Sequence, residues 1–489
     1  MRRLAISVVC VWLAGCSFAP IYHIPEMDLP AKYAEASDPV LSQIPAEWWT
    51  SYHDDDLDAL IRRIDVTNQT LKKSIALLQD SRAQADAARA AYFPTAGANA
   101  SATSSHVSAN VVGRSLAGKT TPDRLIGFSA TWEPDLFGRI GNAVDAATSR
   151  VQANADDVAA VRLTLQAEVA TDYFAIRSLD REASLLRQTV DAYSSVLSMV
   201  TNRYKGGIAA ESDVAQAQAQ RDSTKAQLAD LTLARTQLQH ALATLVGEPA
   251  STFSIAPHDA YGTQLPEIPA AVPSELLKRR PDIAAVERRV SAANSQIGVA
   301  KAAFFPSLML NLSGGVESSG LAGLLTAPGR FWAVGPALAA TIFDGGKRQA
   351  GVDSAQAQFD AAAADYRQTV LTAVQDVEDN YSATSLLKEA ASSQEAAVQA
   401  SQRALAQATD RYKKGAAAYL DVNVVEATTL TNERTLESIH RRQLVSSVAL
   451  FRSLGGGWQA KDGADAQTTN VDPLATSEPA TPEGPHSKR

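Results

Sequence analysis

An internal repeat constrains this chain more than any other feature of its sequence. The segment AAYFP at 90–94 returns as AAFFP at 302–306, 212 residues later. Four more landmarks return 208 residues later: DY at 172–173 as NY at 380–381, RYKGG at 203–207 as RYKKG at 411–415, DV at 213–214 as DV at 421–422, and Gly247 as Gly455. Because the landmarks keep one order, the sequence predicts two copies of one unit, 55–247 and 274–457. The change of offset predicts about four fewer residues in a loop of the second copy.

Each copy contains long stretches with the apolar spacing of helices. Residues 55–91 predict one helix of about 37 residues, and residues 140–204 predict a helix about 98 Å long. The chain then reverses at Gly206-Gly207, and 212–245 predict another helix. The second copy predicts helices over 274–303, 346–412 and 419–454. Since the shorter helices together match the long one, two short helices are expected to stack end to end beside each long helix.

The long helices also carry apolar residues at heptad-like spacing, which predicts helical neighbours. These residues are Leu165, Val169, Tyr173 and Ile176 in the first copy, and Val370, Val374, Val377 and Tyr381 in the second. Residues 54–56 form an aspartate run that is read as a helix N-terminal cap. Residues 345–348 are read as a strand-to-helix turn, because the spacing of a phosphate-binding loop is missing.

Between the first two helices of each copy the period changes to two residues, which predicts a β-hairpin. Ile126, Phe128, Ala130 and Trp132 give the first hairpin one apolar face, and Leu308, Leu310 and Leu312 do so in the second. Four strands cannot close a barrel, which needs about eight, so their edges require other chains. The predicted fold is mainly α, with a long α-helical barrel and four strands per chain that complete a trimeric membrane β-barrel. A soluble capping hairpin is the alternative.

The N-terminus has the pattern of a secretory signal. Arg2 and Arg3 precede an apolar run at 4–14, and the run ends in LAGC at 13–16, which resembles a bacterial lipobox. The sequence therefore predicts a signal peptide at 1–15 and a lipidated segment at 16–54, with the acyl chains on Cys16. A plain signal peptide is the alternative. Ser17 stands where an aspartate favours inner-membrane retention, so the outer membrane is the expected location.

Composition and motifs exclude several classes of function. The net charge is -8 and no Lys/Arg block exceeds three residues, which argues against nucleic acid. Cys10 and Cys16 are the only cysteines, so the rest of the chain forms neither a disulfide nor a thiolate metal site. The sequence lacks the serine-nucleophile and zinc-protease motifs, so we expect no enzyme, cofactor or metal. Residues 458–489 predict a disordered tail.

Taken together, these residues resemble the outer-membrane efflux protein family of TolC-like exit ducts. Within it they resemble the NodT-like lipoproteins of resistance-nodulation-division (RND) efflux systems. The marks are the lipobox, EWW at 47–49, YFP at 92–94, RPD at 280–282, FP at 305–306 and FDGGK at 343–347. The resemblance implies a homotrimer, lipid-anchored in the outer membrane and extending into the periplasm, where residues 248–273 form part of an equatorial collar. It implies a passive duct for drugs or other small toxic compounds, with a periplasmic adaptor and an inner-membrane RND-type transporter as partners.

The resemblance also places both helix reversals at the periplasmic tip, where the adaptor docks. The residues concerned are Arg203, Tyr204, Gly207, Asp213, Arg411, Tyr412, Gly415 and Asp421. A purely structural role is the alternative, since glycine permits the reversal and an aspartate stabilises the next helix by about 0.3–1 kcal/mol. Some relatives carry an acidic gate in the second turn, where this chain has Ala416–Ala418. Two further functions stay open: a poreless periplasmic coiled-coil lipoprotein, and an exit duct for type I protein secretion.

Overall fold

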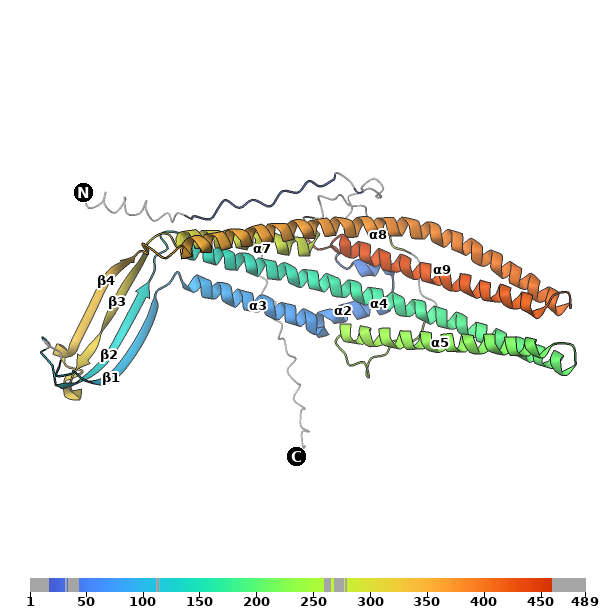
Figure 1. Ribbon diagram of the computed structural model, residues 1–489, viewed down its shortest axis with the longest axis horizontal. Helices are drawn as coiled ribbons and strands as arrows, with labels where there is room; N and C mark the ends of the chain where they lie inside the picture. Colours follow the sequence, from blue (N-terminus) through green and yellow to red (C-terminus); the bar gives the residue numbers. More distant parts are fainter. Residues whose placement is uncertain are drawn as a thin grey trace, which may run out of the picture.

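The computed structural model is an elongated molecule with a β-sheet at one end and long helices along the rest (Figure 1). It describes residues 17–30, 33, 44–110, 113, 115–258, 265–267, 277 and 279–459. The predicted signal peptide, the lipidation site Cys16, nearly all of the predicted disordered tail and part of the linker 248–273 lie outside the described residues.

Two helices of equal length form the axis of the molecule. α4 (Arg139–Lys205) and α8 (Lys347–Lys413) each have 67 residues, which corresponds to about 100 Å. Each is followed by an antiparallel helix of 35 residues, α5 (Glu211–Leu245) and α9 (Tyr419–Ser453). These bounds lie within one residue of the predicted ones. Figure 1 shows α5 beside the half of α4 that is farther from the sheet, and α9 beside the corresponding half of α8.

The first predicted helix is broken into two, so the prediction of one helix over 55–91 was wrong. α2 (Asp55–Thr67) ends at Asn68, whose ψ of 124° is extended, and α3 (Gln69–Ala90) follows. The Asn68 side chain accepts a hydrogen bond from the Leu71 N–H at 2.8 Å and donates one to the Leu245 carbonyl at 2.6 Å. The break therefore fixes the stacking point of α3 against the end of α5.

The corresponding helix of the second copy is α7 (Pro281–Ala302), which packs on α4 and α8. Pro281 occupies its first turn, where the missing N–H needs no partner. The predicted helix began at residue 274, and residues 274–276 lie outside the described part. The RPD segment at 280–282 does open a helix, as expected.

The four strands form one antiparallel sheet in the order β1-β2-β3-β4. They are β1 (Thr95–His106), β2 (Thr120–Trp132), β3 (Ser307–Ser318) and β4 (Arg330–Ala339), and the short 3₁₀ helices Leu321–Gly323 and Ala327–Gly329 join the last two. β2 has 13 residues and β4 has 10, so the shortening of the second copy lies partly in a strand, not only in a loop as predicted. Within the described residues, the outer edges of β1 and β4 have no strand partner.

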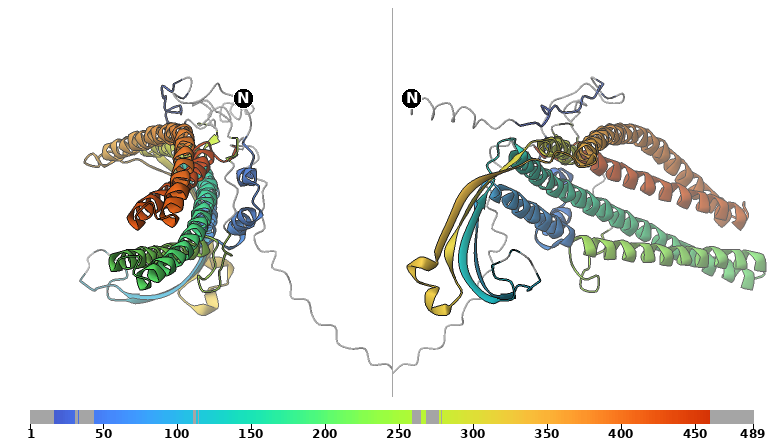
Figure 2. Two further views of the ribbon diagram at one scale, coloured as in Figure 1. Left: turned by 90° about the vertical axis from the view of Figure 1, so that its right-hand side faces the viewer. Right: turned by 60° about the vertical axis from the view of Figure 1, so that its left-hand side comes forward.

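The strand register divides the side chains of the sheet between two faces. Paired residues share a face, and two neighbouring rows on one face are apolar: Ala96, Ala130, Leu312 and Val334; Ala98, Phe128, Gly314 and Trp332. The adjoining rows belong to the opposite face and carry small or polar residues, among them Gly97, Ser129, Ser313, Thr95, Thr131 and Asn311. The prediction of one apolar face is confirmed, with Leu125, Met309 and Phe331 as exceptions on the other. The sheet is curved (Figure 2).

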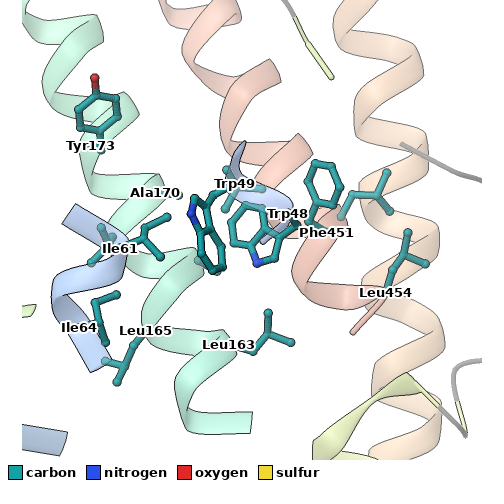
Figure 3. Close-up of a cluster of buried hydrophobic side chains, with 14 of the residues drawn as sticks. Trp48, Trp49, Ile61, Ile64, Leu163, Leu165, Ala170, Tyr173, Phe451 and Leu454 are labelled. Carbon is teal, nitrogen blue, oxygen red and sulfur yellow. The ribbon is translucent and has the colours of Figure 1, made fainter. Parts of the chain in front are cut away.

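The main hydrophobic core lies at mid-length, where the 3₁₀ helix Trp48–Tyr52 and α2 pack against α4 and α9 (Figure 3). Trp48 is fully buried, and its ring stacks on Phe451 with centroids 5.3 Å apart. Burying one large apolar side chain contributes about 1.5–3 kcal/mol. The EWW segment is therefore part of the core. None of the helices in the described ranges is both long and apolar enough to cross a membrane.

Candidate functional site

The two helix reversals have the same backbone geometry. Gly207 and Gly415 both have φ of 73°, in the left-handed region that glycine adopts most readily. The N–H groups that follow bond back to the ends of the long helices. Ile208 N–H donates to Arg203 O at 2.9 Å, and Ala416 N–H donates to Arg411 O at 2.8 Å. This six-residue closure is the Schellman motif of helix C-termini. The glycines therefore have the chain-reversing role that the sequence indicated.

The two aspartates of the predicted tip cap the helices that leave it. The Asp213 carboxylate accepts a hydrogen bond from the Ala210 N–H at 3.4 Å, and Asp421 does the same with the Ala418 N–H at 3.3 Å. Each therefore satisfies a backbone donor that the helix leaves unpaired. For these two residues the contacts support the structural reading.

The arginines and tyrosines of the tip differ in burial and in contacts between the two copies. The Arg203 guanidinium lies 4.7 Å from the centre of the Tyr412 ring, a cation–π contact between the copies. Tyr412 and Tyr419 are buried in a cluster with Val200, Ala217 and Val422. Tyr204 and Arg411, by contrast, are exposed. The structure thus brings residues of both predicted turns into one apolar cluster that joins the ends of the two helix pairs.

Glu426 lies on α9 one turn behind this cluster, and the sequence analysis did not single it out. Its Oε2 atom is buried and has no hydrogen-bond partner in the structure. Burial raises the pKa of Glu426 from an ordinary value near 4.5 to about 7. Burial, followed by the charge of Glu426, also raises the pKa of Tyr419 to about 12. A carboxyl group that titrates near neutral pH therefore lies close to the tip.

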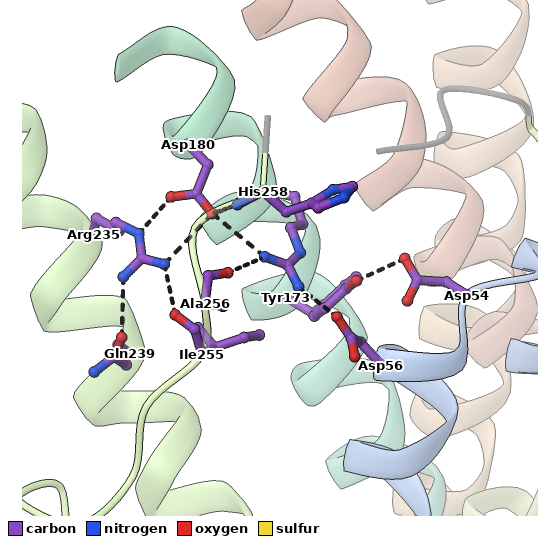
Figure 4. A network of polar contacts seen from close by, with 10 residues as sticks. Asp54, Asp56, Tyr173, Asp180, Arg235, Gln239, Ile255, Ala256 and His258 are labelled. Atoms are coloured by element: carbon purple, nitrogen blue, oxygen red, sulfur yellow. Dashed lines mark hydrogen bonds and ion pairs between the residues drawn. The ribbon is translucent and has the colours of Figure 1, made fainter. Parts of the chain in front are cut away.

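An ionic network at mid-length was also missed (Figure 4). The Arg177 guanidinium is buried and donates to Asp56 at 2.8 Å and to the Ala256 carbonyl at 2.7 Å. The Asp180 carboxylate accepts from Arg235 at 2.5 Å and from the His258 N–H at 3.2 Å. The network therefore holds the described start of the linker 248–273 against α4 and α5. One signal was available, because positions 177 and 180 continue the heptad stripe through Tyr173 with charged residues.

The first described residues lie along α7 and reach the base of the sheet. Phe18 stacks on Phe305 with ring centroids 4.2 Å apart, and Phe305 also stacks on Phe137 at 5.0 Å. Ser17 donates to the Asn142 side chain at 3.0 Å. Phe305 immediately precedes the segment that leads into β3. The N-terminal segment is thus held at the junction between helices and strands, one residue after Cys16.

The aspartate run and the glycine turn have the roles that the sequence indicated. Asp54 accepts a hydrogen bond from the Leu57 N–H at 3.1 Å and so caps α2. Gly345 and Gly346 have positive φ values of 64° and 91°, and Gly346 is the N-cap of α8. No group of three or more His, Cys, Asp or Glu side chains in the described part is arranged to hold a metal ion.

Comparison with known proteins decides the family. The family model for outer membrane efflux proteins matches residues 60–248 and 272–456. The chain belongs to this family. Its members are outer-membrane efflux channels, transport proteins and not enzymes, which agrees with the predicted location and with the prediction of no catalysis. The two matched segments fall within one to two residues of the copies 55–247 and 274–457 at three of their four ends.

Two curated relatives and one solved structure show how far the similarity extends. The toluene efflux pump outer membrane protein TtgC of Pseudomonas putida is 30% identical over 476 residues, covering 96% of this chain and 98% of TtgC. The cation efflux system protein CusC of Escherichia coli is 28% identical and covers 94% of this chain and 99% of CusC. The structure of the outer-membrane channel OprN superposes with a TM-score of 0.85 at 29% identity, covering 91% of this chain and all of that one.

Proposed function

We propose that this chain, as a homotrimer, is the passive outer-membrane exit duct of a tripartite efflux pump. One observation carries the proposal: a four-stranded sheet with one apolar face continues directly into two helices about 100 Å long, each with an antiparallel partner. A one-faced sheet suits a barrel wall between lipid and water, and the helices suit a tunnel across the periplasm. Family membership supports the same role.

The free strand edges support a trimer. Among the described residues, β1 and β4 each leave one edge without a strand partner, and unpaired backbone groups are costly in lipid. Joining β4 of one chain to β1 of the next closes the sheet without any edge. Three copies supply about twelve strands, which is above the roughly eight that a closed barrel needs.

Cross-linking tests this arrangement. Apart from Cys10 in the predicted signal peptide and Cys16, whose sulfur is acylated in the proposed mature protein, the chain has no cysteine, so the introduced thiols are the ones that react. Ala98→Cys on β1 combined with Val334→Cys on β4 is expected to give covalent trimers with a bifunctional thiol reagent. The control is Ala130→Cys with Leu312→Cys, a pair that faces across β2 and β3 and is expected to link only within one chain. Monomers from both pairs would contradict the trimer.

We further propose that Cys16 is lipidated and anchors the chain in the inner leaflet of the outer membrane. The support is that Ser17 and Phe18 contact the base of the sheet, near the level at which the strands begin. Acyl chains on the residue before Ser17 would then be near the bilayer. Mass spectrometry of the mature N-terminal peptide is expected to show the acyl groups, and Cys16→Ser is expected to abolish them; an unmodified wild-type peptide would refute the anchor.

For the tip we propose docking of a periplasmic adaptor that connects the duct to an inner-membrane transporter of RND type. The support is the exposure of Tyr204 and Arg411 beside the two reversals. Gly207→Val combined with Gly415→Val is expected to abolish adaptor binding and efflux, because valine resists the left-handed conformation. The control is Gly351→Val on α8, where a side chain enters open space. Normal binding and efflux in the tip variant would refute docking there.

The proposed cargo is drugs or other small toxic compounds delivered by the transporter. Relatives of similar identity carry different cargo names, toluene for TtgC and cations for CusC, so the duct does not by itself define the cargo. Deleting the gene is expected to sensitise cells to the compounds that the partner transporter handles, and restored resistance on re-expression checks the assignment. A defect in protein secretion alone would favour the secretion duct instead.

A further inference from the structure

Charged residues at the far end of the sheet are sorted by face. Arg124 on β2 pairs with Ser318, and Arg330 on β4 pairs with Val316, so both arginines lie on the face that carries Phe128, Leu312 and Trp332. The carboxylates at this end, Asp123 and Glu317, belong to the opposite face. Because neighbours in sequence point to opposite sides of a strand, Arg124 and Asp123 are separated by the sheet itself.

The arginines have no carboxylate partner available on their own face. Arg124 donates one hydrogen bond, to the Ser319 carbonyl at 2.6 Å, and the Arg330 side chain forms no ion pair with another described residue. The hairpin connections 107–119 and 319–329 contain no Asp or Glu but do contain Arg114 and Lys119. Strand β1, which meets β4 of the next chain in a closed barrel, has no Asp or Glu either. Within the part of the chain that the structure describes, these guanidinium groups therefore lack an acidic partner.

The position of the arginines indicates what lies opposite them. This step rests on the proposed function, in which the helices occupy the periplasm and the apolar face contacts lipid. The end of the sheet farthest from the helices then lies at the outer leaflet of the outer membrane (Figure 1). Arg124 and Arg330 stand where the apolar rows end, next to Trp332, which is 78% exposed. Tryptophan at the end of an apolar band marks the headgroup level.

We propose that Arg124 and Arg330 bind the phosphate groups of an anionic glycolipid in the outer leaflet. Arginine presents a planar fork of N–H donors that matches phosphate oxygens, and the pairing is strong where water is partly excluded. The two side chains lie diagonally across β3, so they form one basic patch on each chain. The site would fix the depth of the barrel from the outside, while the N-terminal anchor fixes it from the inside.

Lipid binding to the full-length lipidated protein in neutral detergent tests the proposal. The probes are lipid A with its two phosphates, dephosphorylated lipid A and inorganic phosphate, and native mass spectrometry measures each binding constant. We expect saturable binding of phosphorylated lipid A, and at least about tenfold weaker binding in Arg124→Gln/Arg330→Gln, since each lost charged hydrogen bond is worth about that factor. Arg124→Lys/Arg330→Lys keeps the charge and is expected to retain part of the affinity.

The matched control is Asp123→Asn/Glu317→Gln, which changes charge at the same level on the other face and is expected to leave lipid A binding unchanged. Equal binding of the dephosphorylated lipid by the wild type would overturn the proposal without any variant. Equal affinity for inorganic phosphate would overturn the headgroup assignment. Wild-type binding by the glutamine variant would overturn the role of the two arginines. Single-channel conductance of the same preparation separates this failure from that of the duct, which would show as a protein that never conducts.

Discussion

The two halves of this molecule have the same order and lengths of long helices. They differ in the buried polar contacts at mid-length, where the returning helix of each half ends. Their long helices have 67 residues each and the helices that return have 35 each. The first half carries the buried network of Arg177, Asp180 and Arg235, whereas the positions 208 residues later hold Ser385, Lys388 and Gln443. The network binds the linker at the end of the first half. The difference teaches that the two halves agree in helix lengths and reversals, while the segment attached to the end of each half determines its buried polar contacts.

The tips of the two halves differ in a similar way. Tyr412 is 8% exposed and lies under Arg203, whereas its counterpart Tyr204 is 44% exposed. The turns themselves have the same φ and the same closing hydrogen bonds. Similar local sequences that share one glycine, Gly207 or Gly415, therefore give the same turn, and packing across the halves decides which tyrosine is buried.

The largest expected effect comes from breaking the network in the first half alone. Arg177→Met leaves the Asp180 carboxylate, which is 3% exposed, with one fewer cation, and removal of one partner from a buried pair costs about 3–5 kcal/mol. The matched change in the second half, exposed Ser385→Ala, is expected to cost less than about 0.5 kcal/mol. Denaturant unfolding followed by tryptophan fluorescence checks both. Similar losses in the two variants would show that the halves are equivalent at this level.

The next largest effect is a difference in stability between substitutions at the ends of the returning helices and the same substitutions at the tips. Gly247 and Gly455 have positive φ, and a Cβ at either would overlap a backbone carbonyl, that of Thr67 or Arg279. Alanine there is expected to cost about 3 kcal/mol, from left-handed strain plus the steric overlap. Gly207 and Gly415 also have positive φ but open space around them, so alanine at the tips is expected to cost only about 1 kcal/mol. Melting temperatures of the four single variants give the order, and equal shifts would contradict it.

A smaller effect is a pH dependence of stability that arises in the second half only. Burial raises the pKa of Glu426 to about 7, whereas its counterpart in the first half is the neutral Gln218. The folded state holds the proton more tightly than the unfolded state, so stability is highest below about pH 4.5 and falls as pH rises through 7. After allowance for solvent screening, the loss is expected to be on the order of 1 kcal/mol. Glu426→Gln should flatten the stability profile between pH 5 and pH 8, as denaturation midpoints would show; an unchanged slope would contradict this.

The smallest expected effect is at the contact between the tips. Arg203→Gln removes the cation over the Tyr412 ring and is expected to cost about 0.5–1 kcal/mol. Arg411 has no such ring contact among the described residues, so Arg411→Gln, the same change in the other half, is expected to be neutral in the monomer. A double-mutant cycle with Tyr412→Leu measures the coupling. A coupling energy near zero between Arg203 and Tyr412 would contradict the prediction that the two tip arginines contribute differently to stability.

Much of the fold could be predicted because its signals are local. The ends of α4, α5, α8 and α9 follow from glycine reversals and from long stretches without proline, and the faces of the sheet follow from alternation. The break at Asn68 was missed because its side chain needs the carbonyl of Leu245, which is distant in sequence. The shorter β4 was assigned to a loop because alternation does not give the length of a strand.

The candidate site was predicted less completely, for a physical reason. Gly207 and Gly415 have an intrinsic signature, since their turns need a left-handed residue. Arg177, Asp180 and Glu426 are buried by other helices and by the linker, and these contacts are distant in sequence. For positions 177 and 180 one local indication was available, because they are charged residues that continue an apolar heptad stripe.

The most direct test of the central claim is the single-channel conductance of the purified, lipidated protein in a planar bilayer, with its oligomeric mass determined in the same detergent. The account predicts trimers that give discrete conductance steps. A monomer, or a trimer that never conducts, would contradict the duct and favour a poreless periplasmic scaffold.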